Sequence, residues 1–201
     1  MADLHATFWG WTDTIGLAPI YHRYLEFGPE CVSLEAQWGW PDAVPPLIVE
    51  GWKRFASTGG PVAGPVIELA CDPSPLVDAL ATVPHTLLHG DWKLGNLGSH
   101  PDGRTILLDW ALPGQGSPTA ELAWYLALNA ARLPNTKEEA IGAYRMSLEA
   151  HGVTTGDWWD RALALSLLGG LVWFGWEKAL GGPGPELAWW LDHSAEGLRR
   201  L

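Results

Sequence analysis

The sequence has 201 residues, of which 47% are hydrophobic and 17% are charged, and this balance indicates a folded domain rather than a disordered chain. Its formal net charge is −11, from 23 acidic and 12 basic residues, which opposes binding to nucleic acid or to an anionic membrane. Cys31 and Cys71 form no CxxC pair, so neither a disulfide framework nor a zinc knuckle is expected.

No signal peptide is predicted, because the N-terminal residues show no basic segment followed by an apolar one. The longest apolar stretch, residues 162–176, is too short and too often interrupted by glycine to predict a membrane span. We therefore expect a cytoplasmic protein. The 14 tryptophans are predicted to pack in the core rather than to stack on a sugar or a base.

Residues 1–84 are predicted to form a helical section. Leu4, Phe8 and Trp11 recur at helical spacing, so residues 2–12 are expected to contain the end of a helix. Further helices are predicted at residues 20–27, 47–57, 62–70 and 75–82, whereas residues 28–46 are rich in glycine, proline and tryptophan and show no clear pattern.

Residues 85–112 have a different character. Two short apolar runs, residues 86–88 and 105–108, lie on either side of the turn-forming sequence Pro101-Asp102-Gly103. This arrangement predicts a small β-hairpin made of residues 97–99 and 105–108, next to a loop at residues 89–96.

Residues 113–201 are again predicted to be helical. Ser117 and Pro118 are typical of a helix start at residue 119, and residues 136–139 form a capping box before a helix over 140–150. Two more helices are predicted at 157–180 and 185–201, and Gly114 and Gly116 are expected to be a helix or hairpin exit. The sequence thus predicts one mainly α-helical α+β domain over residues 1–201.

The loop His89-Gly90-Asp91-Trp92-Lys93-Leu94-Gly95-Asn96 and the later Asp109 carry the side chains best suited to chemistry. Asp91 can accept a proton, Lys93 can neutralise a phosphate, and Asn96 and Asp109 supply the hard oxygens that suit Mg²⁺. Phosphoryl transfer needs this equipment, because it depends mainly on positioning and charge stabilisation. The alternative is structural: Asp91 and Asn96 would hold the loop together, and Asp109 would cap the hairpin.

HGDxxxxN followed by Leu108-Asp109-Trp110 resembles the signature of the aminoglycoside phosphotransferase and choline kinase-like family, and also the catalytic loop of protein kinases. Residues 114–118 and Glu121-Leu122-Ala123 resemble the family's later GxP and DLA steps, with Glu121 in place of the usual aspartate. Residues 4–9 look like the helix that follows the hinge in these proteins. The resemblance implies a protein-kinase-like C-terminal lobe with a short β-hairpin beside the catalytic loop.

The resemblance also implies a role for each residue of the loop. Asp91 would be the catalytic base, Lys93 would contact the transferred phosphate of ATP, and Asn96 and Asp109 would hold Mg²⁺. His89 could act as a catalytic acid or base, but a structural histidine that forms hydrogen bonds within the loop is the preferred interpretation.

Full-length members of this family begin with a five-stranded lobe that holds ATP, and no such lobe is recognisable ahead of the motifs. The sequence also contains neither GxGxxG nor a Walker motif. We therefore expect a C-terminal lobe without its N-terminal lobe, with weak binding of MgATP. We also expect a homodimer, because Leu4, Phe8, Trp9 and Trp11 would otherwise expose an apolar surface.

Three functions are compatible with these features. The first is an ATP-dependent O-phosphotransferase, or its catalytic half, that acts on a small molecule, for which the acidic chain would favour a cation. The second is a small-molecule binding module without turnover. The third is a metal-assisted hydrolase of activated esters that uses Asp91, His89 and a metal-bound water.

Overall fold

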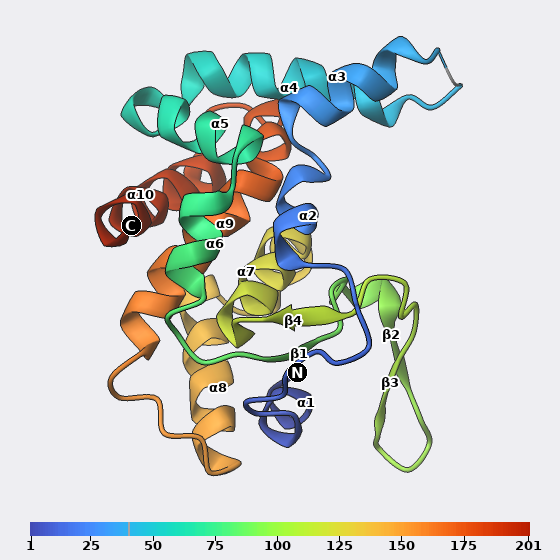
Figure 1. The fold of residues 1–201 in the computed structure, drawn as a ribbon, viewed down its shortest axis with the longest axis vertical. Coiled ribbons are helices and arrows are strands. Elements are labelled where there is room, and N and C mark those ends of the chain that lie inside the picture. Colours follow the sequence, from blue (N-terminus) through green and yellow to red (C-terminus); the bar gives the residue numbers. More distant parts are fainter. Residues whose placement is uncertain (40) are drawn as a thin grey trace. The chain divides into compact units, whose positions relative to one another are not determined.

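The computed structural model describes residues 1–39 and 41–201 and confirms a mainly helical α+β chain (Figure 1). Its elements follow one another as α1 (Ala2–Thr7), α2 (Ile20–Leu25), α3 (Pro29–Gln37), α4 (Val44–Thr58), η1 (Gly60–Val62), α5 (Ala63–Cys71), α6 (Ser74–Leu80), β1 (Thr86–Leu88), η2 (Leu94–Asn96), β2 (Leu97–Ser99), β3 (Thr105–Leu107), β4 (Gly114–Gly116), α7 (Pro118–Leu128), η3 (Ala130–Arg132), α8 (Lys137–Ala150), α9 (Trp159–Leu180) and α10 (Pro185–Arg200).

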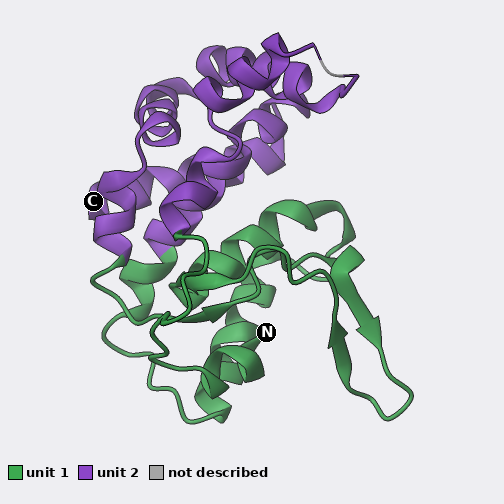
Figure 2. Ribbon diagram, turned by 45° about the vertical axis from the view of Figure 1, so that its right-hand side comes forward, with its two compact units in different colours: residues 1–19, 81–163 green, residues 20–80, 164–201 purple. Residues whose placement is uncertain are grey.

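The chain forms two compact units (Figure 2). Unit 1 contains residues 1–19 and 81–163, and unit 2 contains residues 20–80 and 164–201. Each unit combines an early and a late segment, so the units do not coincide with the three consecutive sections described from the sequence. The loop at residues 89–96 and Asp109 both lie in unit 1.

Unit 1 contains two pairs of short antiparallel strands. In one pair Leu97 lies opposite Leu107, which confirms the predicted hairpin, and this hairpin extends from the rest of unit 1 in Figure 2. In the other pair β1 lies against β4, with Leu88 opposite Gly114. The sequence prediction missed β4, because its residues Gly-Gln-Gly lack the apolar alternation of a strand. The position is also tightly packed: a Cβ atom at Gly114 would lie 3.0 Å from the carbonyl oxygen of Ala18, which favours glycine there.

Two helices of unit 1 pack against β1. Helix α1 packs against β1 and α8, and α7 also contacts β1. The capping box at the start of α8 is confirmed: the Glu139 amide donates to Thr136 Oγ1 at 3.1 Å, and the Thr136 amide donates to Glu139 Oε2 at 2.9 Å. Helix α1 ends before residue 12, because the amide of Gly10 turns away and donates to the carbonyl oxygen of His85 at 2.9 Å.

Unit 2 is a helical unit with an aromatic core. Tyr24 stacks on Trp173 with ring centroids 4.2 Å apart, and the Trp173 indole donates to the carbonyl oxygen of Arg23 at 2.8 Å. The Trp52 indole donates to the carbonyl oxygen of Phe27 at 2.7 Å. These tryptophans combine core packing with one satisfied N–H group, as buried tryptophans usually do. Helix α3 lies in the stretch of residues 28–46, for which no clear pattern was found.

Helix α9 contains the apolar stretch of residues 162–176 and is longer than that stretch. It spans 22 residues, and its most apolar 18-residue window has a mean hydropathy of 1.2, so by length and composition it could cross a membrane. However, 78% of that window is buried inside the protein. Burial of this extent is typical of a helix in the hydrophobic core.

Candidate functional site

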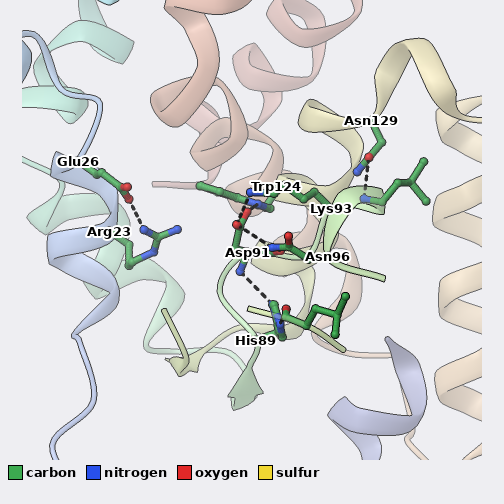
Figure 3. Close-up of polar contacts among 10 residues, drawn as sticks. Arg23, Glu26, His89, Asp91, Lys93, Asn96, Trp124 and Asn129 are labelled. Carbon is green, nitrogen blue, oxygen red and sulfur yellow. Dashed lines mark hydrogen bonds and ion pairs between the residues drawn. The ribbon is translucent and has the colours of Figure 1, made fainter. Parts of the chain in front are cut away.

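The carboxylate of Asp91 is the centre of the candidate site (Figure 3). Its side chain is 11% exposed and lies in the loop that follows β1. Lys93 Nζ lies 2.5 Å and Asn96 Nδ2 lies 2.9 Å from Asp91 Oδ2, while the indole N–H of Trp124 donates to Asp91 Oδ1 over 3.3 Å. The structure thus brings together Asp91, Lys93 and Asn96.

The two oxygens of Asp91 differ in what they can still accept. Oδ2 already receives hydrogen bonds from Lys93 and Asn96. Oδ1 receives one longer bond from Trp124. A carboxylate oxygen can accept about two hydrogen bonds, so Oδ1 keeps the capacity to accept a further donor, such as the hydroxyl group of a ligand.

Asn96 is oriented by the loop so that its side-chain oxygen remains available. Its Nδ2 donates both to the carbonyl oxygen of Asp91 at 3.0 Å and to Asp91 Oδ2 at 2.9 Å. An amide NH₂ group has two hydrogens, so both are used, and Oδ1 of Asn96 accepts no hydrogen bond from the part of the chain that the structure describes. Such an oxygen suits Mg²⁺.

Asp109 lies between two residues that contact the loop. The Leu108 amide donates to the carbonyl oxygen of Asn96 at 2.9 Å, and the Trp110 ring centroid lies 4.6 Å from that of His89. Asp109 itself is exposed and has a positive φ of 59°, which is uncommon for a residue other than glycine. Among the described residues, its carboxylate forms no hydrogen bond or ion pair.

The available donors fit a magnesium ion by their chemistry. Asn96 and Asp109 offer an amide oxygen and a carboxylate, and Mg²⁺ in proteins commonly binds one or two such groups, with water and phosphate oxygens completing its coordination. A cluster of three or more histidine, cysteine, aspartate or glutamate side chains is not found within residues 1–39 and 41–201. Convergence of Asp91, Asn96 and Asp109 on one cation stays a prediction.

His89 is fully buried, and both of its ring nitrogens bind backbone groups. Its Nδ1 accepts the amide hydrogen of Asp91 at 3.3 Å, and its Nε2 lies 2.9 Å from the carbonyl oxygen of Leu108. Because the carbonyl oxygen can only accept, Nε2 carries the ring hydrogen. These contacts support the structural interpretation of His89, which fixes the loop next to the end of β3.

Glu121 contacts the loop, although sequence reasoning assigned it no role in the site. It is 3% exposed, lies in the first turn of α7, and accepts the amide hydrogens of His89 at 3.2 Å and Gly90 at 2.6 Å. It therefore holds the backbone amides of the two residues that precede Asp91 in the chain. An acidic residue within a helix that is otherwise apolar and buried was the signal that could have identified it.

Two further residues of α7 and its C-terminal end contact the loop. Trp124 follows Glu121 by three positions, so both side chains lie on the same face of the helix. Asn129, which is 2% exposed, accepts the amide hydrogen of Leu94 at 3.1 Å through its Oδ1. Sequence reasoning missed both contacts, since a tryptophan or asparagine in this region has no distinctive pattern.

Comparison with known proteins agrees with these local features. The model of the phosphotransferase enzyme family matches residues 65–158, a range that includes the loop, Asp109 and α7. This match confirms the resemblance inferred from HGDxxxxN and the following Asp-Trp step. No curated protein and no solved structure gives a significant match, so the likeness to a protein-kinase C-terminal lobe stays a prediction.

Proposed function

We propose, from the match of residues 65–158 to the phosphotransferase enzyme family, that this protein transfers the γ-phosphoryl group of ATP to a hydroxyl group of a small molecule. The observation that carries the proposal is the state of the Asp91 carboxylate. Lys93 and Asn96 fix Oδ2, and Oδ1 keeps the capacity to accept a hydrogen bond from a hydroxyl group.

Asp91 acts on the substrate hydroxyl group. The hydroxyl donates its hydrogen to Asp91 Oδ1, which aims the hydroxyl oxygen at the γ-phosphorus. As the new O–P bond forms, the bond between the γ-phosphorus and the β–γ bridging oxygen breaks and ADP leaves. The hydroxyl proton passes to the Asp91 carboxylate.

Lys93, Asn96 and Asp109 provide the charge stabilisation. The side chain of Lys93 is 41% exposed, and its ammonium group has three hydrogens, so it can bind a phosphoryl oxygen while it remains bonded to Asp91. Asn96 Oδ1 and the Asp109 carboxylate would hold Mg²⁺, which when bound neutralises negative charge on the phosphate oxygens.

Calorimetric titration with MgATP, followed by ³¹P NMR with a panel of hydroxyl compounds, tests this function. We expect the natural protein and Asp91→Asn to bind MgATP, and Asp109→Asn to bind it more weakly. Both variants should fail to form a phosphorylated product. Saturation with a small molecule but with no phosphoryl transfer by the natural protein would favour a binding module. Cleavage of p-nitrophenyl acetate without nucleotide would favour a hydrolase.

A further inference from the structure

A buried chain of hydrogen bonds leads from α8 through α1 to the catalytic loop. The hydroxyl oxygen of Tyr144 lies 2.6 Å from His5 Nδ1, and His5 Nε2 lies 2.8 Å from Glu121 Oε2. Glu121 in turn accepts the amide hydrogens of His89 and Gly90. We call the first three residues the Tyr144–His5–Glu121 chain. Its members are 7%, 0% and 3% exposed.

The partners decide where the hydrogens of this chain lie. Glu121 accepts from two backbone amides, and its Oε2 is also the acceptor for His5, so Nε2 of His5 carries a hydrogen. Burial raises the pKa of Tyr144 well above its usual value, and the negative charge of Glu121 adds to this effect. Tyr144 therefore keeps its hydrogen and can donate it to Nδ1 of His5.

This arrangement orients the Glu121 side chain and also provides hydrogen-bond donors for its buried carboxylate. A glutamate side chain has several rotatable bonds, and the two loop amides bind its oxygens unequally: the Gly90 amide donates to Oε1 at 2.6 Å, whereas the His89 amide donates to Oε2 over a longer 3.2 Å. His5 is the second and closer partner of Oε2, at 2.8 Å, and the backbone of His5 is itself held, because its carbonyl oxygen accepts a hydrogen bond from Thr86 Oγ1 at 2.8 Å. Helix α1, strand β1 and the loop are thereby joined through buried polar groups.

We propose that His5 is a positioning residue for the phosphoryl transfer assigned above: through Glu121 it sets the place of the peptide groups of His89 and Gly90, and hence of the Asp91 carboxylate. Tyr144 supports this role by fixing the orientation and tautomer of the imidazole ring. The expected effect on kinetics rests on the proposed function, whereas the expected effect on the position of the loop does not.

Three variants separate positioning from packing. His5→Met keeps a side chain of similar length but removes the donor to Glu121. His5→Gln keeps an N–H donor at the position of Nε2. Tyr144→Phe removes the hydroxyl group alone. His22→Gln and His22→Met are the matched controls, because His22 is exposed and belongs to unit 2.

The first readout is the ¹H–¹⁵N resonance of the Gly90 amide in the nucleotide-free protein, since this amide lies 2.6 Å from a carboxylate oxygen and should resonate far downfield. We expect a large upfield shift in His5→Met, a smaller one in Tyr144→Phe, and little change in His5→Gln or in either His22 control. The second readout is phosphoryl transfer, where His5→Met should lose about 100-fold in kcat at unchanged KM for MgATP, and His5→Gln should recover most of that loss.

An unchanged Gly90 resonance in a folded His5→Met variant overturns the proposal, and so does a His5→Gln variant as defective as His5→Met. If His5→Met does not fold, Tyr144→Phe decides: no shift of the Gly90 amide overturns the proposal, and a shift in the same direction supports it. Because the resonance is measured without nucleotide, it tests the position of the loop even if the natural protein transfers no phosphoryl group.

Discussion

Gly90 lies so close to the backbone of Leu112 that a Cβ atom at position 90 would be 1.7 Å from the Leu112 carbonyl oxygen. Gly90 also has a positive φ of 84°. A side chain here therefore meets backbone atoms that cannot rotate away, in a conformation that favours glycine. We expect Gly90→Ala to lower the free energy of unfolding by about 3 kcal/mol or more, measured by urea denaturation.

Gly95→Ala is the control for this substitution. Gly95 belongs to the same loop, but nothing lies within 4 Å of the position that a Cβ atom would take there, and its φ is not positive. We expect this variant to change the free energy of unfolding by no more than about 0.5 kcal/mol. Equal losses in the two variants would contradict a role for close contact at position 90.

Asp109 should show the stability pattern of a left-handed residue. Its φ of 59° is open to glycine without strain, whereas alanine in this region costs about 1–2 kcal/mol. We expect Asp109→Ala to be less stable than Asp109→Gly by about 1 kcal/mol in thermal or chemical unfolding. Both variants should lose Mg²⁺-dependent binding of nucleotide to the same degree, because both lack the carboxylate. An Asp109→Ala variant more stable than Asp109→Gly would show that the backbone is not held there.

Asn96→Asp separates two tasks of one side chain. The aspartate keeps an oxygen for Mg²⁺ but replaces the NH₂ group, which donates to Asp91 at 2.9 Å and 3.0 Å, with an acceptor. We expect the concentration of Mg²⁺ needed for half-maximal activity to stay the same or fall, while kcat falls at least about 10-fold, since Asp91 is repelled instead of fixed. An unchanged kcat would contradict the prediction, because it would show that activity does not depend on the hydrogen bonds from Asn96 to Asp91.

Two buried tyrosines should respond in opposite ways to removal of their hydroxyl groups. Tyr24 is fully buried, and its hydroxyl oxygen has no hydrogen-bond partner among the described residues, whereas that of Tyr144 is bonded to His5. We expect Tyr24→Phe to raise the free energy of unfolding by about 1 kcal/mol and Tyr144→Phe to lower it by about 1 kcal/mol. Urea denaturation at neutral pH measures both.

Tyr24 also predicts how stability depends on alkaline pH. Burial raises the pKa of Tyr24 far above the usual tyrosine value of 10.0, so the folded chain keeps a proton that the unfolded chain loses. A folded-state pKa above the unfolded one contributes stability that is complete below about pH 10 and is lost as the pH rises further. Between about pH 9 and 11, the free energy of unfolding should therefore decline less steeply with pH in Tyr24→Phe than in the natural protein. Parallel declines would contradict the burial of this phenol.

Local signals in the sequence were sufficient for the elements that local chemistry forms. The turn at residues 101–103 closes the predicted hairpin, and Thr136 with Glu139 caps α8. Strand β4 was not predictable in this way, because it is formed by pairing with β1, which lies far earlier in the chain. Helix α3 begins with Pro29 after an extended Gly28, a start signal that the surrounding glycines and prolines obscured.

In the candidate site, too, contacts between residues close in sequence were predictable and contacts between distant elements were not. Asp91, Lys93 and Asn96 are close in sequence, and the motif predicted that they act together. The contact of Glu121 with the loop and that of His5 with β1 were not predictable, since they join α7 and α1 to residues more than 30 positions away in the first case and more than 80 in the second. A buried polar group reveals its partner only when the packing of the helices is known.

The pairing of β1 with β4 makes the segment between them a long loop whose two ends are held together. Leu88 and Gly114 lie opposite each other, so the loop of residues 89–113 begins and ends at the same point of unit 1. The exposed turn at residues 101–103 lies near the middle of this loop in the sequence. The entropy of closing such a segment grows slowly with its length, by about 0.6 kcal/mol for each doubling. A short epitope or fluorophore-binding peptide inserted after Asp102 should therefore allow this protein to be detected in a cell without moving either end of the loop.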